Sequence, residues 1–436
     1  TRSVSAFLLN RSADLLVWWI GWYANGMTVM MKEDALMVEE VVVTGYTTQR
    51  KADLTGAVST VSVDELAKQN ENNPIKALQG RVPGMNITPD GGSPSGKAAV
   101  RIRGVGTMNA GADPLYIIDG VPTTAGMHEL NGNDIESIQV LKDASSASIY
   151  GSRAANGVII ITTKKGKEGK VKVDFDASVA VQTYAHKIDV LNAKQFGEVM
   201  WQGYVNDGLN PNTNGLGYSY DWSYNPQGYP VLDKITMAKY LDAAGTTPSA
   251  DTDWFDQTTR TGVIHQYNVS LSNGSERGSS FFSLGYYKNN GIIKHTDFER
   301  FSGRMNTEYK LVKVGDRNIV TIGEHFTLNR TSEVEAPGGF IENVLQFNPS
   351  LPVYTTKGDF AGPEGGYADR ENPLARLERN KDNRYTYWRV FGDAYININP
   401  FKNFNIKSTF GLDYAQKEQR IFTYPITEGN VANSTN

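Results

Sequence analysis

The feature that most constrains the fold is a two-residue alternation of apolar and polar side chains, repeated in long segments. In the first such segment the apolar positions are Val171, Val173, Phe175, Ala177, Val179 and Val181. This period is that of a β-strand with one apolar and one polar face. Seven segments of this kind are predicted, near 171–183, 263–273, 279–288, 301–311, 318–330, 385–399 and 403–417. Their length matches the ~9–11 residues of a tilted membrane strand, whereas ordinary strands average ~5–6.

The connections between these segments alternate in length. Tight turns are predicted at 273–278, 314–317 and 399–402, and longer loops at 184–262, 289–300 and 331–384. Short turns on one side and long loops on the other are typical of an outer-membrane β-barrel. A soluble β-sandwich has less reason to sort its loops this way. Seven strands cannot close a bacterial barrel of even strand number, so we expect the N-terminal part of a longer protein.

Composition excludes several classes. The formal net charge of −4 makes nucleic acid an unsuitable partner, and the absence of cysteine excludes disulfide scaffolds and Cys-ligated metals. The longest apolar run, 15–23, has nine residues, against ~20 for a spanning helix.

Residues 91–98 lack the final Ser or Thr of a phosphate-binding loop, and the aspartates between 251 and 256 lack the Gly and Glu of a calcium loop. The five histidines are widely spaced and outside catalytic motifs. We therefore predict no metal site and no enzyme.

Residues 52–167 indicate a small α+β domain. Residues 135–140 alternate like a half-buried strand, and Gly157 precedes an apolar run, 158–161, that suits a fully buried strand. Upstream, short strands alternate with a helix predicted to begin at Pro74. Three loops rich in Gly, Pro and Asn separate these elements, at 90–97, 105–113 and 122–132.

Two segments precede this domain. Val41, Val42, Val43 and Thr44 favour extended backbone, and a polar stretch predicted to be loose follows at 47–51. Such a segment can donate a strand to another protein's sheet, or it can be an ordinary edge strand. Residues 1–38 contain two predicted strands, 15–23 and 27–31, which suit either the end of a small β-domain or an irregular tail.

Four stretches resemble the SusC/RagA family of TonB-dependent outer-membrane transporters. They are EEVVVTGY at 39–46, ALQGRVPGMNI at 77–87, VRIRGVGTMNAGADPLYIIDGVP at 100–122 and IESIQVLKDASSASIYGSRAANGVIIITTKKGKEGK at 135–170. The resemblance implies a transmembrane antiparallel β-barrel of about 22 strands with an N-terminal plug in its lumen. It divides the chain into a remnant of an N-terminal extension, similar to the end of a carboxypeptidase-regulatory-like domain (1–38), a TonB box (39–48), a plug (49–168) and the first part of the barrel (169–436).

The resemblance also implies a function. It implies TonB-dependent import of an oligosaccharide or peptide across the outer membrane, with a SusD-like lipoprotein at the extracellular mouth. No cofactor is implied, because the proton motive force supplies energy through TonB. The alternatives are a siderophore-type receptor and a surface β-protein that binds glycan without transport.

Three sets of residues follow from the resemblance. The TonB-binding set is Glu39, Glu40, Val41, Val42, Val43, Thr44 and Gly45. The candidate substrate-facing loop residues, which can equally be ordinary turn residues, are Asp90, Ser93, Ser95, Thr107, Asn109, Asp113, Thr123, Thr124 and His128. The plug charges predicted to be structural and paired at the barrel wall are Arg101, Arg103, Asp119 and Arg153, with Glu136 and Asp143 as available partners. Force on the TonB box is predicted to unfold the segment around 49–98 and to leave 135–167 in place.

Overall fold

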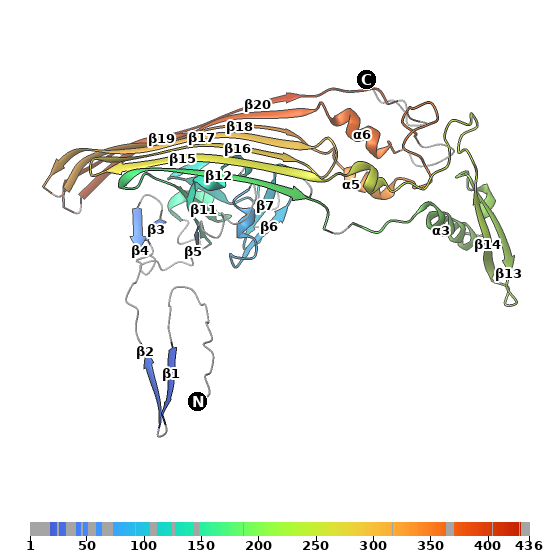
Figure 1. Ribbon diagram of the computed structural model, residues 1–436, viewed down its shortest axis with the longest axis horizontal. Coiled ribbons are helices and arrows are strands. Elements are labelled where there is room, and N and C mark those ends of the chain that lie inside the picture. The colour runs from blue at the N-terminus through green and yellow to red at the C-terminus, as the bar shows by residue number, and fades with distance from the viewer. Residues whose placement is uncertain are drawn as a thin grey trace.

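The computed structural model places a small domain against one face of a long curved β-sheet, as Figure 1 shows. The residues it describes are 18–23, 26–31, 41–44, 47–50, 58–62, 73–91, 93–104, 111–123, 127–142, 148–185, 187–315, 317–362, 370–402, 404–426 and 428.

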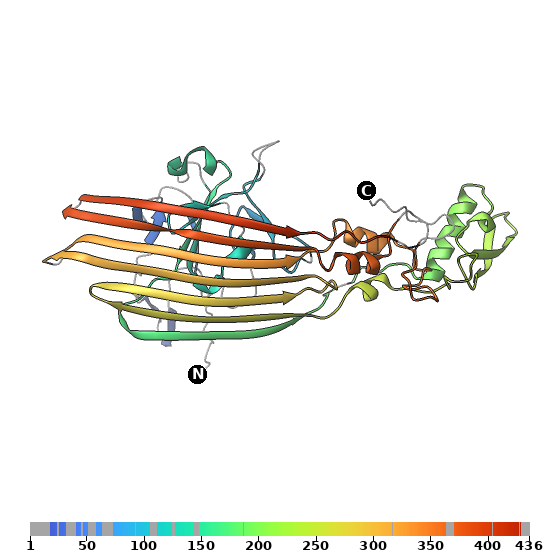
Figure 2. The ribbon, with the colours of Figure 1, turned by 90° about the horizontal axis from the view of Figure 1, so that it is seen from above.

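The long sheet, called the wall below, contains seven strands within the described residues. They are β12 (Gly169–Gln182), β15 (Gly262–Ser275), β16 (Gly278–Asn290), β17 (Asp297–Val314), β18 (Arg317–Val334), β19 (Arg384–Phe401) and β20 (Phe404–Arg420). Each pairs antiparallel with the next along the chain. All seven predicted strands are confirmed, and Figure 2 shows them side by side.

The wall carries apolar side chains on its outer face and polar side chains on its inner face, which is the reverse of a soluble protein. Along β17, Phe301 is 47% exposed on the outer face, whereas Arg300 and Arg304 are buried on the face toward the small domain. The same inversion holds on β18, where Phe326 and Leu328 are exposed and Thr327 and Asn329 are buried. Apolar side chains face outward because the medium outside is lipid, as in outer-membrane barrels.

The small domain, called the plug below, is built on a mixed sheet. Its strands lie in the order β5 (Val58–Ser62), β10 (Ile135–Leu141), β11 (Val158–Thr163), β8 (Leu115–Ile118) and β9 (Val121–Thr123). The predicted strands at 135–140 and 158–161 are confirmed as the antiparallel neighbours β10 and β11. β11 and β8 run parallel, and a separate hairpin joins β6 (Met85–Pro89) to β7 (Ala98–Ile102). Instead of the predicted α-helix after Pro74 there is a single 3₁₀ turn, η2 (Lys76–Leu78).

The plug core is apolar and contacts the wall. Ile75, Leu78, Ile138 and Ile159 are fully or almost fully buried in it, and Phe391 of β19 belongs to the same cluster. Shorter 3₁₀ turns, η3 (Met127–Glu129), η4 (Gly132–Asp134) and η5 (Ser148–Ala154), connect the strands. β12 begins at Gly169, six residues after the end of β11, so a short tether joins plug and wall.

Two hairpins precede the plug. β1 (Trp18–Tyr23) pairs with β2 (Gly26–Met31), and β3 (Val41–Thr44) pairs with β4 (Thr47–Arg50). The prediction that 47–51 is loose is wrong for 47–50. Ladder hydrogen bonds use only main-chain groups, so a polar segment can pair with an apolar one.

Helices and a further hairpin lie at the end of the wall where the long loops emerge, which is the extracellular end in such barrels. The loop after β12 contains α3 (Ala193–Asn206), η6 (Pro211–Thr213), β13 (Tyr218–Tyr224), β14 (Pro230–Met237) and α4 (Trp254–Thr258). The loop after β18 contains α5 (Phe340–Gln346) and α6 (Pro373–Asn380). α4, α5 and α6 share a core that includes Trp254, Phe340 and Leu377.

Among the described residues, no helix combines the length and the apolar character needed to cross a membrane.

Candidate plug–wall interface and ligand cavity

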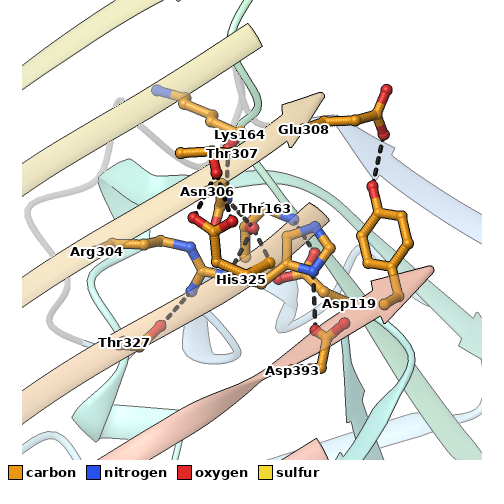
Figure 3. A network of polar contacts seen from close by, with 12 residues as sticks. Asp119, Thr163, Lys164, Arg304, Asn306, Thr307, Glu308, His325, Thr327 and Asp393 are labelled. Carbon is orange, nitrogen blue, oxygen red and sulfur yellow. Dashed lines mark hydrogen bonds and ion pairs between the residues drawn. The ribbon is translucent and has the colours of Figure 1, made fainter. Parts of the chain in front are cut away.

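The plug is fastened to the wall through a buried ion pair, shown in Figure 3. Asp119 lies in the turn after β8 with φ 49°, and Arg304 projects from the inner face of β17. The Arg304 guanidinium pairs with the Asp119 carboxylate, and the two side chains are only 2% and 3% exposed. Burial by itself would raise the pKa of Asp119, but Arg304, His325 and the hydrogen bonds from Thr163 outweigh it and hold that pKa below its ordinary value.

Thr163, at the end of β11, ties this pair to the plug sheet. Its main-chain N–H donates to Asp119 Oδ1 at 2.9 Å and its hydroxyl donates to Oδ2 at 2.8 Å. The same hydroxyl accepts from Arg304 Nη2 at 2.7 Å and from Asn306 Nδ2 at 2.9 Å. On the wall side, Arg304 Nη1 donates to Thr327 Oγ1 at 2.8 Å. Two polar wall residues, Arg304 and Asn306, thus bond to the end of one plug strand.

The network extends across β18 and β19. His325 Nδ1 lies 2.8 Å from Asp393 Oδ1, and Tyr395 donates to Glu308 Oε2 at 2.6 Å. Asn306 also donates to the main-chain oxygen of Lys164 at 2.7 Å, and Figure 3 shows these groups around the Asp119 turn.

A second buried arginine joins wall and plug two strands further on. Arg389 of β19 forms a bidentate pair with Asp413 of β20, with distances of 2.8 and 2.7 Å. It also lies 3.5 Å from Glu129 and donates to Thr123 Oγ1 at 3.0 Å. Thr123, predicted to face a substrate, is therefore 5% exposed and hydrogen-bonded to the wall.

The predicted substrate loop at 90–97 is also held by the wall. Lys97 Nζ lies 2.7 Å from Glu333 and 2.5 Å from Glu335, and Asn289 donates to the main-chain oxygen of Pro94 at 2.9 Å. Burial would lower the pKa of Lys97, but the two carboxylates outweigh it and raise that pKa above its ordinary value. Ser95, predicted to face a substrate, is fully buried because this loop packs against the wall.

The segment around His128 makes a third set of contacts. Arg300 donates to the main-chain oxygens of His128 at 2.8 Å and Leu130 at 2.6 Å, and Ser283 donates to Asp134 at 2.6 Å. Burial, with the nearby charges of Lys97 and Arg300, lowers the pKa of His128 to about 3. The imidazole is therefore neutral at physiological pH.

A cavity of about 430 Å³ opens in the plug. It brings together three predicted substrate-facing residues, Asp113, Thr123 and His128, with Arg153. Its remaining lining is Asn73, Ile75, Lys97, Ala98, Val100, Pro114, Leu115, Tyr116 and Met127. Burial raises the pKa of Tyr116, so its phenol stays protonated. The cavity thus offers hydrogen-bond donors, acceptors and both signs of charge, which suits a polar ligand.

The other predicted residues are more scattered. Asp90 is exposed at the end of β6, and the Ser93 and Ser95 hydroxyls lie 2.8 Å apart. Val41, Val42, Val43 and Thr44 form strand β3. Glu39, Glu40, Gly45, Thr107, Asn109 and Thr124, together with Asp143, lie outside the described residues.

The predicted structural charges have different surroundings. Asp119 is paired at the wall, as predicted, but its partner Arg304 comes from the wall. Arg103 and Arg153 are exposed, and Arg101 is half-buried. Among the described residues, neither Arg101 nor Arg153 forms an ion pair with Glu136 or Asp119.

The wall arginines were missed as site residues. Arg304 occupies the polar face of the alternating segment 301–309, so the signal was present: a charged residue facing inward from a barrel strand.

The comparisons with known proteins agree with this geometry. Residues 50–158 match the model of the TonB-dependent receptor plug domain. TonB-dependent receptor SusC of Bacteroides thetaiotaomicron is 31% identical, over 93% of this chain and 40% of its own length. TonB-dependent receptor P26 of Formosa agariphila is 30% identical, over 95% of this chain and 40% of its own length. The solved structure of the RagAB peptide importer in the open-open state superimposes with a TM-score of 0.66 at 27% identity, covering 87% of this chain and 42% of that one.

In this chain a plug sheet packs against the polar inner face of an outer-membrane barrel wall. This arrangement is that of a TonB-dependent receptor. Within that class, the chain belongs to the SusC/RagA family. It spans about 40% of the length of the curated relatives it matches.

Proposed function

We propose that this chain provides the plug and the first wall strands of a TonB-dependent importer of a polar oligomer. The observation that carries the proposal is the chemistry of the plug–wall contact, where ion pairs and hydrogen bonds of Arg304, Arg389 and Lys97 hold the plug. Polar groups at such an interface can exchange their partners for water once a path opens, whereas an apolar core cannot.

The proposed binding site for TonB is the TonB box at 39–48. Its residues Glu39 to Gly45 include strand β3. TonB would add a strand to Val41–Thr44 through main-chain hydrogen bonds. β3 and β4 precede β5 in the chain, and β5 is an edge strand of the plug sheet whose one neighbour among the described residues is β10. Tension on the box therefore reaches an edge strand first, and its hydrogen bonds break one at a time at ~1 kcal/mol net each.

The proposed substrate is an oligosaccharide or a peptide, and the proposed entry site on the plug is the cavity beside Asp113, His128 and Arg153. The size and polarity of the cavity support this, and the similarity to the RagAB peptide importer supports the peptide. A SusD-like lipoprotein is the proposed partner at the extracellular mouth. No cofactor is proposed; the proton motive force, through TonB, supplies the energy.

The test is uptake by cells that carry the full transporter with Val42→Pro. Proline removes a main-chain donor from β3, so we expect TonB-dependent uptake to be lost at unchanged surface expression. The matched control is Gln49→Pro, at the position opposite Val42 in β4. It disturbs the hairpin and leaves the donor of Val42, so uptake should persist.

Normal uptake in Val42→Pro would contradict the proposal. Glycan binding without any TonB-dependent uptake would favour a surface binding protein. Uptake of a ferric siderophore alone would favour a siderophore receptor.

A further inference from the structure

The loop after β12 folds into a module with its own core, formed by α3, η6, β13 and β14. Trp201 of α3 packs with Leu216, Tyr218 and Tyr220, which are all less than 8% exposed. The Tyr218 hydroxyl donates to the main-chain oxygen of Ala193 at 2.6 Å, and the Tyr220 hydroxyl donates to that of Gly197 at 2.9 Å. Figures 1 and 2 place this module at the far end of the molecule from the plug, beyond α5 and α6.

One face of the β13–β14 hairpin carries a ladder of aromatic residues. Tyr218, Tyr220, Trp222 and Tyr224 follow one another on β13. They lie opposite Met237, Ile235, Leu232 and Pro230 of β14. α3 covers the first two tyrosines, whereas Trp222 is half-buried and Tyr224 is 71% exposed. We call Trp222, Tyr224, Pro230 and Leu232 the aromatic shelf.

The tip beside the shelf is a hydrogen-bonded turn. The main-chain N–H of Asn225 donates to the oxygen of Tyr229 at 2.9 Å, and the N–H of Gly228 donates to the oxygen of Asn225 at 2.8 Å. The Asn225 side chain accepts from the N–H groups of Gln227 at 3.1 Å and Tyr229 at 2.8 Å. The main chain of Tyr229 is thus held at the tip, and its ring is 68% exposed. A main chain ordered in advance loses little conformational entropy when a ligand binds.

The shelf carries no charged side chain. Between 201 and 232 the charged residues are Asp207 and Asp221, and Asp221 lies on the opposite face of the hairpin, across from Lys234. An added peptide strand would need a free edge on β13. The Asn212 amide instead bonds to both the N–H and the oxygen of Tyr220, at 2.8 and 3.1 Å. An uncharged aromatic surface suits the C–H faces of sugar rings, which the electron-rich ring faces attract.

We propose that the aromatic shelf, with Tyr229 at its tip, is a binding site for neutral glycans outside the plug cavity. The shelf stacks against sugar rings and holds a glycan at the extracellular end of the molecule. This binding needs neither TonB nor transport, so it is independent of the proposed import.

The test uses the full transporter in detergent and four neutral probes: maltoheptaose, cellohexaose, mannohexaose and xylohexaose. We expect at least one probe to bind by calorimetry. Tyr224→Ala or Tyr229→Ala should weaken that binding about tenfold, which is ~1.4 kcal/mol, and Tyr224→Phe, which keeps the ring, should retain it. The matched control is Tyr240→Ala, which removes an exposed ring from the opposite end of the hairpin and should leave the affinity unchanged.

Arg153→Ala separates this site from the plug cavity, because it changes the cavity and leaves the shelf intact. The glycan affinity of that variant should match the unsubstituted protein. Absence of binding by all four probes would overturn the proposal, as would equal affinity in Tyr224→Ala. Loss of a co-purifying lipoprotein in Tyr224→Ala, with glycan affinity unchanged, would overturn it in favour of a protein-docking surface.

Discussion

Asp119 of the plug and Arg304 of the wall form an ion pair whose side chains are 185 residues apart in sequence and almost fully buried. Neither charge reaches solvent, so each depends on the other and on Thr163 for solvation. The pair therefore couples the position of the plug sheet to β17.

Asp119→Asn should loosen the plug by about 3–5 kcal/mol, because it leaves the Arg304 guanidinium buried without a counter-charge. Asparagine tolerates the positive φ of 49° at this position, so the substitution tests charge without backbone strain. The measurement is thermal unfolding of the full protein in detergent. The control is Asp113→Asn on the exposed rim of the cavity, which should be nearly neutral. Equal melting temperatures for the two variants would contradict the prediction.

Lys97→Met should release the loop at 90–97 from the wall. The substitution leaves the 2%-exposed Glu333 side chain without its cation, at about 2 kcal/mol. Limited proteolysis should then cut near residues 90–97 faster. Lys194→Met, which breaks a solvent-exposed pair with Glu198 on α3, is the matched control and should leave the cleavage pattern unchanged.

His128 should make the plug sensitive to acid. Its pKa is about 3 in the folded protein and 6.5 in the unfolded chain, so between these values the unfolded chain binds the additional proton. Stability therefore falls as the pH drops from 6.5 towards 3. His128→Gln should flatten the dependence of melting temperature on pH within that window. An unchanged slope would show that the imidazole is not held neutral by its surroundings.

Gly157→Ala should destabilise the plug by about 2–3 kcal/mol. Gly157 precedes β11 with φ 89°, and an added Cβ would lie 2.9 Å from Ile102 Cδ1. Gly80→Ala separates the two effects: Gly80 has φ 74° but open space around the added atom. It should therefore cost only the backbone strain, about 1 kcal/mol. A larger loss for Gly80→Ala than for Gly157→Ala would refute this account.

The strands were predictable from the sequence because alternation depends only on which face each residue occupies. The wall strand β17, for example, alternates from Phe301 through Arg304, and this local signal needs no partner. The pairing of Arg304 with Asp119 was not predictable, since it depends on how two distant elements dock. The alternation along β17 predicts only that the Arg304 side chain lies on the inner face of the wall.

Two local features were missed for different reasons. β4 was predicted to be loose because its residues are polar, but main-chain pairing with β3 decided its structure. The module at 193–237 lies within the predicted loop 184–262, although it carries a capping box, in which Asn192 and Gln195 bond each other's main-chain N–H groups at the start of α3. The alternation of Tyr218, Tyr220 and Trp222 was a second available signal.

If tension on the TonB box opens the plug, the sheet topology predicts the order of opening. β5 is an edge strand joined to one neighbour, whereas β10 and β11 each have two. A force that arrives through β3 and β4 therefore acts first on the β5–β10 ladder, and the β10–β11 pair should stay in place. If import proceeds this way, a covalent cross-link between β5 and β10 should block import. A cross-link between β10 and β11 should leave import unchanged.

Two disulfides that share one residue test this order. Val61 and Ile161 each lie opposite Ile138, one in β5 and the other in β11, and all three side chains are buried in the plug core. The chain contains no cysteine of its own, so the pairs Val61→Cys with Ile138→Cys, and Ile138→Cys with Ile161→Cys, add only the intended cross-links. The first pair should abolish TonB-dependent uptake under oxidising conditions and recover it with a reductant. The second should transport in both conditions, because its strands need not separate. Loss of uptake in the oxidised second pair alone would place the opening on the other side of β10.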